Sequence, residues 1–214
     1  MDVLGLIPAR GGSKGILRKN LASVGGRPLL AWTVDAARAA TELTRVVVST
    51  DDDEIAAAAD VEVLRRPAEL AGDDTPMIDV VRHAVAELSP DVVVLLQPTS
   101  PLRRAEHVDA AVRLLLESGA DAVVSVVAVP HRYHPDALMD VVDGRVVARG
   151  SARARQEKEL VYARNGPAVL ALRSHRLGDD LYAGDCRPYL MDERDSLDVD
   201  EPFDLELADL LLGR

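Results

Sequence analysis

Short apolar runs alternate with longer segments rich in alanine and leucine along most of the chain. The apolar runs occupy residues 2–7, 45–49, 91–96 and 121–127. Nearly continuous runs of this kind are typical of strands that are buried on both faces of a parallel sheet. Segments with helical spacing lie between them, at residues 28–40, 52–59, 76–88 and 105–118. This alternation predicts an α/β fold with a single doubly wound, mainly parallel sheet.

The pattern changes between about residue 130 and residue 162. Asp143-Gly144 separates two pairs of valines there, which predicts a β-hairpin because Asp-Gly is a preferred two-residue turn. A run of charges at residues 149–159 follows, as in a solvated face or loop. Residues 168–172 and 203–212 then predict one more strand and a terminal helix. We therefore expect a single domain over residues 1–214, with residues 130–162 as a small β-containing arm.

Composition narrows the classes of partner. The chain has 214 residues and a formal net charge of −11, which argues against a nucleic-acid backbone as partner because phosphates are neutralised by basic surface. Its single cysteine, Cys186, excludes an intramolecular disulfide and a thiolate metal cluster, as expected in a reducing compartment. No apolar run approaches the ~20 residues that span a bilayer. We therefore expect a cytoplasmic protein that binds neither membrane nor nucleic acid.

The segment from Ile7 to Leu21 combines small residues with cations directly behind an apolar run. Its glycines allow backbone N–H groups to approach phosphate oxygens, and Arg10, Lys14 and Lys19 supply positive charge that the acidic chain otherwise lacks. The order Ser13-Lys14-Gly15 excludes a Walker A loop, in which Gly-Lys precedes Ser or Thr. Taken alone, the segment is either a cradle for a polyphosphate or an ordinary glycine-rich turn.

A second polar segment follows the apolar run at residues 91–96. Gln97, Thr99, Ser100 and Arg103 are held between prolines at the point where the predicted strand ends. Ligands of open α/β sheets bind outside the carboxyl ends of strands, and these side chains suit a hydroxylated, anionic substrate. The alternative is a proline-braced turn that caps the next helix.

The third segment is acidic and spans residues 195–200. In an extended backbone Asp198 and Asp200 project to one side, while Leu197 and Val199 anchor the other. Two carboxylates on one side form a platform of hard oxygen ligands for Mg²⁺. The alternative is a solvated acidic turn before the final helix.

Together these segments resemble the N-acylneuraminate cytidylyltransferase family, which includes CMP-sialic acid synthetases and relatives acting on other nonulosonic acids. The similarity runs through residues 7–21, 47–51, 66–71, 95–103, Arg155-Gln156, Tyr162, Asn165-Gly166 and 195–200, in the order of the family. The resemblance implies a Rossmann-like nucleotidyltransferase fold and a homodimer formed through the arm. It also implies a Mg²⁺-dependent transfer of CMP from CTP to the hydroxyl group of an acidic sugar, with release of pyrophosphate.

The same resemblance implies roles for individual residues. The nucleotide would contact Pro8, Ala9, Arg10, Gly12, Ser13, Lys14, Asn20 and Arg66, and a backbone carbonyl between Pro8 and Arg10 would accept a hydrogen bond from the cytosine amine. The sugar acid would contact Gln97, Thr99, Ser100, Arg155, Arg164 and Asn165. Catalysis would depend on Arg10, Lys19, Asp198 and Asp200, the last two as Mg²⁺ ligands.

The chain departs from the family's pattern on the acceptor side. Pro167-Ala168-Val169 follows Asn165-Gly166 where many relatives carry an Ile-Tyr pair, and the chain has only one Phe and four Tyr for an apolar cage around an N-acetyl group. The acceptor is therefore either a nonulosonic acid, such as a deaminated one, or a phosphonate or other small acid. A non-catalytic nucleotide-binding module is the alternative from a different class, and Lys19, Asp198 and Asp200 count against it.

Overall fold

The computed structural model describes residues 1–13, 15–149, 159–182 and 184–213. Its central sheet contains the strands β1 (Val3–Pro8), β4 (Arg45–Thr50), β5 (Glu62–Arg65), β6 (Val92–Leu95), β7 (Ala122–Ala128), β10 (Tyr162–Arg164), β11 (Leu170–Arg173) and β12 (Cys186–Met191). These strands follow the order β10-β7-β11-β6-β1-β4-β5, and β12 also pairs with β7. Two short two-stranded sheets, β2 (Ser23–Val24) with β3 (Arg27–Pro28) and β8 (Met139–Val142) with β9 (Arg145–Ala148), complete the described strands.

The sheet is mainly parallel, as the sequence predicts. β1 runs parallel to both β4 and β6, β4 to β5, and β12 to β7, whereas β10 and β11 are antiparallel to their neighbours. All six residues of β1 are buried, because Val3 and Ile7 face one apolar cluster and Leu4 and Leu6 face the other. Burial on both faces explains why this strand is continuously apolar.

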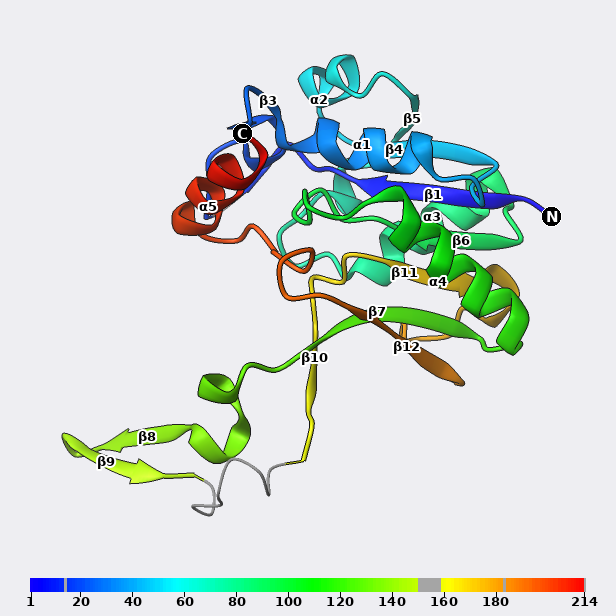
Figure 1. Cartoon of the computed structure of the whole chain (residues 1–214). Helices are drawn as coiled ribbons and strands as arrows, with labels where there is room; N and C mark the ends of the chain where they lie inside the picture. The colour runs from blue at the N-terminus through cyan, green and yellow to red at the C-terminus, as the bar shows by residue number, and fades with distance from the viewer. Residues whose placement is uncertain (14, 150–158, 183, 214) are drawn as a thin grey trace.

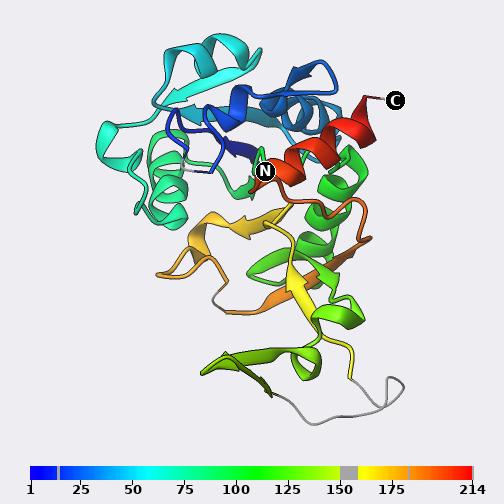
Figure 2. The same cartoon turned by 90° about the vertical axis from the view of Figure 1, so that its left-hand side faces the viewer.

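Helices cover both faces of the sheet (Figures 1 and 2). α1 (Leu29–Ala39), α2 (Asp53–Ala58) and α4 (Ala105–Ser118) contribute apolar residues to the cluster that contains Val3 and Ile7. α3 (Met77–Leu88) packs on the opposite face, and α5 (Pro202–Leu212) packs against β2 and the buried Val199. None of the described helices has the length and apolar composition needed to cross a membrane.

The structure contains strands that the hydrophobic pattern did not predict. β5, at the end of the sheet, has two partly buried apolar residues between two exposed charged ones, so it lacks a continuous apolar run. β12 contains Pro188, which removes one backbone donor and which strands tolerate mainly at a sheet edge. Both strands depend on pairing with a neighbouring strand. That pairing involves residues distant in the sequence, so the local pattern of β5 and β12 does not reveal it.

The hairpin predicted at Asp143-Gly144 is present as β8 and β9. Both turn residues have positive φ, 51° and 73°, as a type I′ turn requires. The hairpin extends away from the rest of the chain in both views (Figures 1 and 2) and leaves Val141, Val142, Val146 and Val147 exposed. Most of the charge run at residues 149–159 lies outside the described residues.

Candidate active site

A cleft of about 510 Å³ opens at the carboxyl ends of the parallel strands. Pro8 ends β1, Arg66 follows β5 and Gln97 follows β6, so all three reach the same edge of the sheet. β1 lies between β4 and β6, and the strands that follow it in the sequence are added on both of its sides. This reversal of strand order is the topological switch point, where open α/β sheets bind ligands. The cleft is lined by Pro8, Arg10, Gly12, Ser13, Gly15, Lys19, Asn20, Arg66, Met77, Gln97, Pro98, Thr99, Asp200 and Glu201.

Side-chain contacts fold the loop after β1 back over this edge. The Asn20 amide nitrogen donates to the carbonyl oxygen of Arg10 at 2.9 Å, and the backbone N–H of Gly11 donates to the Asp51 carboxylate at 3.1 Å. A Cβ atom on Gly15 would lie 2.9 Å from the backbone oxygen of Asp200, so this close approach requires glycine. The loop is therefore held against the sheet edge and the segment that carries Asp200.

Lys19 connects the loop to that acidic segment. Its ammonium group donates to the carbonyl oxygen of Val199 at 2.9 Å and lies 3.1 Å from the Asp200 carboxylate. The Lys19 side chain is largely buried, whereas that of Asp200 is mostly exposed to solvent. Two residues separated by 181 positions thus meet at the rim of the cleft.

Two arginines, Arg10 and Arg66, bring positive charge to the cleft. Arg66 is buried, donates to the backbone oxygen and the hydroxyl group of Ser49, and has a pKa lowered to about 10, chiefly by burial. The charge of Arg10 lowers this pKa further, so the two guanidinium groups act on each other. Arg10 is paired with Asp73 at 2.6 Å. This part of the cleft is suited to an anion that can replace the Asp73 carboxylate.

Asp198 and Asp200 have the alternation that the sequence predicts. Leu197 and Val199 pack into the apolar cluster beside α5, and the Val199 N–H donates to the backbone oxygen of Thr99 at 2.7 Å. Oxygen Oδ1 of Asp198 is buried and has no hydrogen-bond partner among the described residues. Burial raises the pKa of Asp198, and the charge of Asp200 acts in the same direction, whereas the Thr99 hydroxyl and the charge of Lys19 oppose it.

The unsatisfied oxygen of Asp198 fits the chemistry of a hard cation, which carboxylates bind. No group of three or more Cys, His, Asp or Glu converges as a metal site within the described ranges. Mg²⁺ commonly uses one or two carboxylates and completes its shell with water and substrate phosphates. The pair Asp198 and Asp200 therefore fits Mg²⁺ bound together with a nucleotide.

The side of the cleft around Gln97 is built on a glycine turn at Gly166. The amide nitrogen of Gln97 donates to the backbone oxygen of Gly166 at 3.1 Å. Gly166 has a φ of +113°, and a Cβ atom there would lie 3.1 Å from the Ser100 hydroxyl oxygen and 3.4 Å from the Asp198 carboxyl carbon. The buried hydroxyl group of Ser100 has no partner among the described residues, and the Thr99 hydroxyl lies close enough to Asp198 to act on the pKa of that carboxyl. Two hydroxyl groups thus lie close to Asp198.

Asn165 is only 3% exposed and both ends of its amide are engaged. Its oxygen accepts from the Ser125 hydroxyl at 2.6 Å, and its nitrogen donates to the Ser196 hydroxyl at 2.9 Å. In this arrangement Asn165 ties the segment carrying Asp198 to β7. Its predicted contact with a sugar acid stays a prediction.

The predicted site residues fall into three groups. Those that line the cleft are Pro8, Arg10, Gly12, Ser13, Lys19, Asn20, Arg66, Gln97, Thr99 and Asp200. Ala9, Ser100, Asp198, Asn165 and Arg164 are not among its lining residues, and the exposed Arg164 stacks over the Tyr182 ring at 4.7 Å. Lys14 and Arg155 lie outside the described residues.

Sequence reasoning missed Asp73 and Met77. Met77 starts α3 and lines the cleft, but a methionine at a helix start carries no signal for a ligand. Asp73 lies in the acidic turn Gly72-Asp73-Asp74, and its meaning depends on the long-range contact with Arg10.

The chain is similar to known proteins in both sequence and fold. Residues 4–209 match a family model described as cytidylyltransferase. The chain is 31% identical over 215 residues to an N-acylneuraminate cytidylyltransferase of Escherichia coli O18:K1:H7, covering 96% of this chain and 51% of that protein. It is 28% identical over 240 residues to a CMP-N,N'-diacetyllegionaminic acid synthase of Campylobacter jejuni, covering 99% and 95%. The chain thus spans about half the length of the Escherichia coli relative.

The fold is similar to that of a solved CMP-2-keto-3-deoxy-manno-octonic acid synthetase complexed with CTP. The TM-score is 0.78 at 17% sequence identity, and the match covers 100% of this chain and 99% of that one. Similarity at this identity concerns the fold, and it agrees with the α/β architecture and mainly parallel sheet described above.

Proposed function

The chain belongs to the cytidylyltransferase family, and we propose that it transfers CMP from CTP to the hydroxyl group of a nonulosonic sugar acid, with release of pyrophosphate. The observation that carries the proposal is the cleft itself, where Arg10, Lys19 and Arg66 face the carboxylate of Asp200. The names of the relatives, an N-acylneuraminate cytidylyltransferase and a CMP-N,N'-diacetyllegionaminic acid synthase, support this class of acceptor.

Residues that line the cleft supply the positive charge that this reaction needs. The acceptor hydroxyl attacks the α-phosphorus, a bond from phosphorus to the acceptor oxygen forms, and the bond to the leaving pyrophosphate breaks. Negative charge then grows on the leaving oxygens, which Arg10 and Lys19 stabilise when they contact the phosphates. Arg66, fixed by Ser49, supplies a cation that needs no reorganisation during the reaction.

We propose that Asp198 and Asp200 hold Mg²⁺ once CTP is bound. The buried Oδ1 atom of Asp198 has no hydrogen-bond partner among the described residues and is therefore available as a ligand. When bound there, the metal ion would neutralise phosphate charge and lower the pKa of a coordinated hydroxyl group. We also propose that Asp198, whose pKa is raised by burial, accepts the proton of the attacking hydroxyl group.

The identity of the acceptor follows from the wall around Gln97. Among the described residues that line the cleft there is no aromatic side chain. A binding site for an N-acetyl group commonly offers apolar or aromatic surface. This observation favours an acceptor without a bulky acyl group, such as a deaminated nonulosonic acid, and keeps a phosphonate or another small acid as the second candidate.

We also propose that two copies associate through the arm at residues 130–162. The exposed valines of the β8–β9 hairpin support this assembly, because an exposed apolar patch marks a surface that another protein covers. The cytoplasmic location expected from the single cysteine stays a prediction.

The proposal is tested by measuring pyrophosphate release from CTP and Mg²⁺ with a panel of acids. The panel contains N-acetylneuraminic, deaminated neuraminic, legionaminic, pseudaminic and 3-deoxy-octulosonic acids and two simple phosphonates. Turnover with one nonulosonic acid is expected, and it should fall at least 10²-fold in Asp200→Asn. Asp185→Asn, a change at an exposed carboxylate outside the cleft, is the matched control and should leave the rate unchanged.

Three other results would change the assignment. Turnover with a phosphonate alone would keep the chemistry and replace the acceptor. Equal turnover of CTP and UTP would contradict the expected contact between the cytosine amine and a carbonyl of residues 8–10. CTP binding measured by calorimetry, together with no pyrophosphate release from any acid, would favour a non-catalytic nucleotide-binding module.

A further inference from the structure

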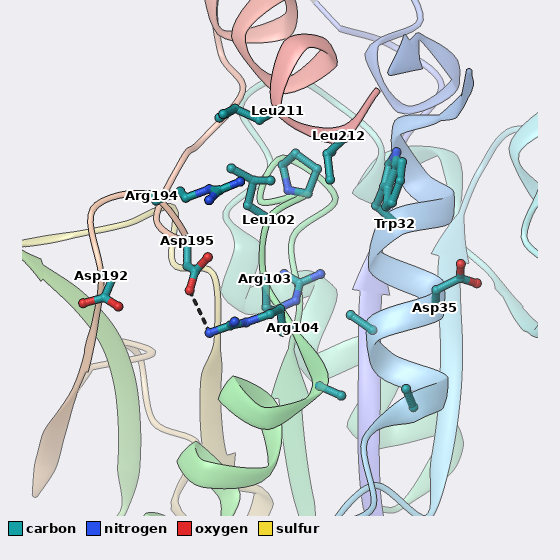
Figure 3. A pocket seen from close by; sticks show the side chains of 14 residues that line it. Trp32, Asp35, Leu102, Arg103, Arg104, Asp192, Arg194, Asp195, Leu211 and Leu212 are labelled. Carbon is teal, nitrogen blue, oxygen red and sulfur yellow. Dashed lines mark hydrogen bonds and ion pairs between the residues drawn. The ribbon is translucent and has the colours of Figure 1, made fainter. Parts of the chain in front are cut away.

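A second cavity, of about 650 Å³, lies outside the cleft and has no part in the proposed reaction. Its walls come from α1, the turn before α4, the segment at residues 192–195 and the end of α5. Figure 3 shows Trp32 on α1 facing Leu102 and Leu212 across this space. The volume lies within the range of small-molecule sites, about 300–1,000 Å³.

The walls of the cavity combine apolar residues with charged ones, and the apolar residues are the more numerous. Its lining includes Trp32, Ala36, Ala39, Pro101, Leu102, Ala105, Leu211 and Leu212. The Trp32 ring is fixed from one side, because its N–H donates to the Val24 carbonyl at 3.0 Å and the Arg27 guanidinium lies 4.8 Å from its centre. A rigid indole opposite leucine side chains offers a surface for a flat organic group.

Positive charge without a matching carboxylate borders these walls. Arg103 is 3% exposed, and its Nε and Nη2 atoms are buried without a hydrogen-bond partner among the described residues. Burial lowers the Arg103 pKa to about 9. Arg194, exposed at the rim, has no ion pair within the described part of the chain, and Figure 3 shows its side chain directed toward Leu102.

The acidic residues of the cavity do not fully compensate these two arginines. Asp195 is bound to Arg104 at 2.9 Å, and Asp35 is bound to Arg27 at 2.6 Å. Asp192, on the same side of the cavity as Arg194 in Figure 3, is exposed and offsets at most one of the two arginine charges. The uncompensated charge beside the apolar walls is therefore positive, which favours an anion over a cation or a neutral ligand.

From these observations we propose that the cavity is a second binding site, for a small organic anion with a flat apolar body. The flat group would lie against Trp32, Leu102 and Leu212, and the anionic group would meet the exposed Arg194, with the buried charge of Arg103 behind the wall adding to the positive field. The proposal goes beyond the transferase reaction, and its test does not depend on turnover.

The site also adjoins the proposed active site. Arg103 donates to the backbone oxygen of Gln97 at 3.1 Å, and Gln97 lines the cleft. Asp195 borders the cavity three residues before Asp198. An occupant of the cavity would therefore contact the two segments that carry Gln97 and Asp198, on the side that faces away from the cleft.

Trp32 makes the site directly observable, because it is the only tryptophan in the chain. The probe is 8-anilinonaphthalene-1-sulfonate, which has a flat apolar body and a single negative charge. Titration into the full chain, with excitation of Trp32, should give saturable quenching of the tryptophan together with sensitised probe emission. The experiment is run with and without saturating CTP and Mg²⁺, and the Trp32 signal should saturate in both.

Two variants and one control decide the outcome. Arg194→Ala should weaken the probe at least fivefold by removing the exposed cation, and Ala36→Phe should abolish the saturable signal by filling the cavity. Arg38→Ala, which removes an exposed arginine of the same helix outside the cavity, should leave the affinity within twofold. Circular dichroism establishes that each variant is folded. The absence of saturable energy transfer, or equal affinity in wild type, Arg194→Ala and Ala36→Phe, would overturn the proposal.

Discussion

Lys19 and Asp200 form an ion pair of 3.1 Å at the rim of the cleft, and the same ammonium group donates to the carbonyl oxygen of Val199 at 2.9 Å. This contact joins the loop after β1 to the acidic segment before α5. The lysine thus has two functions in the proposed reaction. It orients a carboxylate for the metal ion, and it brings positive charge to the phosphates.

Replacing Lys19 by methionine should therefore lower kcat/KM for CTP by about 10²-fold or more, because a positioned charge and the hold on Asp200 are lost together. The measurement is pyrophosphate release at saturating acceptor. Arg18→Met is the matched control, since Arg18 pairs with Asp52 and Glu54 and does not line the cleft. A loss of similar size in both variants would mean that any substitution in this loop disturbs the site, and would contradict a specific role for the Lys19 charge.

The ion pair of Arg10 with Asp73, at 2.6 Å, predicts that removing either partner changes the affinity for CTP, in opposite directions. A phosphate of CTP that binds Arg10 must displace the Asp73 carboxylate. Breaking a partly exposed ion pair of this kind costs about 0.5–1 kcal/mol. Asp73→Asn should therefore tighten CTP two- to fivefold in calorimetry, whereas Arg10→Ala should weaken it strongly. Asp74→Asn, a neighbouring exposed carboxylate, serves as the control for general charge. Weaker CTP binding in Asp73→Asn would contradict the competition.

The buried strands were predictable from the sequence because their burial is recorded in their own residues. β1 and β6 lie in the middle of the sheet, so each residue of these strands had to be apolar. β5 and β12 were not predictable in this way, since an edge strand needs only one buried face and β12 even contains Pro188. Their pairing is decided by strands distant in the sequence.

The same distinction applies to the site. Residues that directly follow a central strand, such as Gln97, reach the cleft because parallel strands end at one edge. The predicted contact of Asn165 with a ligand stays a prediction, and the structure adds that Ser125 and Ser196 engage its amide in the interior. Those serines come from distant segments, so spacing along the chain gave no indication of the contact.

The β8–β9 hairpin predicts the state of association. Val141 and Val146 lie opposite each other in the hairpin and are 76% and 65% exposed. Burying a valine contributes roughly 1.5–3 kcal/mol, so glutamate at either position should separate a dimer into monomers. Light scattering after size exclusion measures this. Arg145→Ala changes the same hairpin at a polar position and should leave the dimer intact. A wild-type monomer at micromolar concentration would contradict the assembly.

His107 supplies the last prediction, which concerns pH. Its Nδ1 accepts the backbone N–H of Arg104 at 3.2 Å, and this cap of α4 requires an unprotonated nitrogen. Burial lowers the pKa of His107 below its usual value of about 6.5, with Arg104 and Arg103 lowering it further and Asp195 and Glu106 opposing them. The unfolded chain therefore binds this proton more readily than the folded one. Stability from His107 is present above about pH 6.5 and is lost as the pH falls through the lowered pKa of the folded state.

His107→Gln should accordingly remove part of this pH dependence. Urea unfolding at pH 7.5 and pH 5.5 gives the free energy of unfolding at both values for each protein. The drop between the two pH values should be smaller in His107→Gln than in wild type, because glutamine does not titrate. His175→Gln replaces a histidine that is exposed and should reproduce the wild-type drop. An unchanged drop in His107→Gln would mean that protonation leaves the cap of α4 intact, and a larger drop would reverse the sign of the argument.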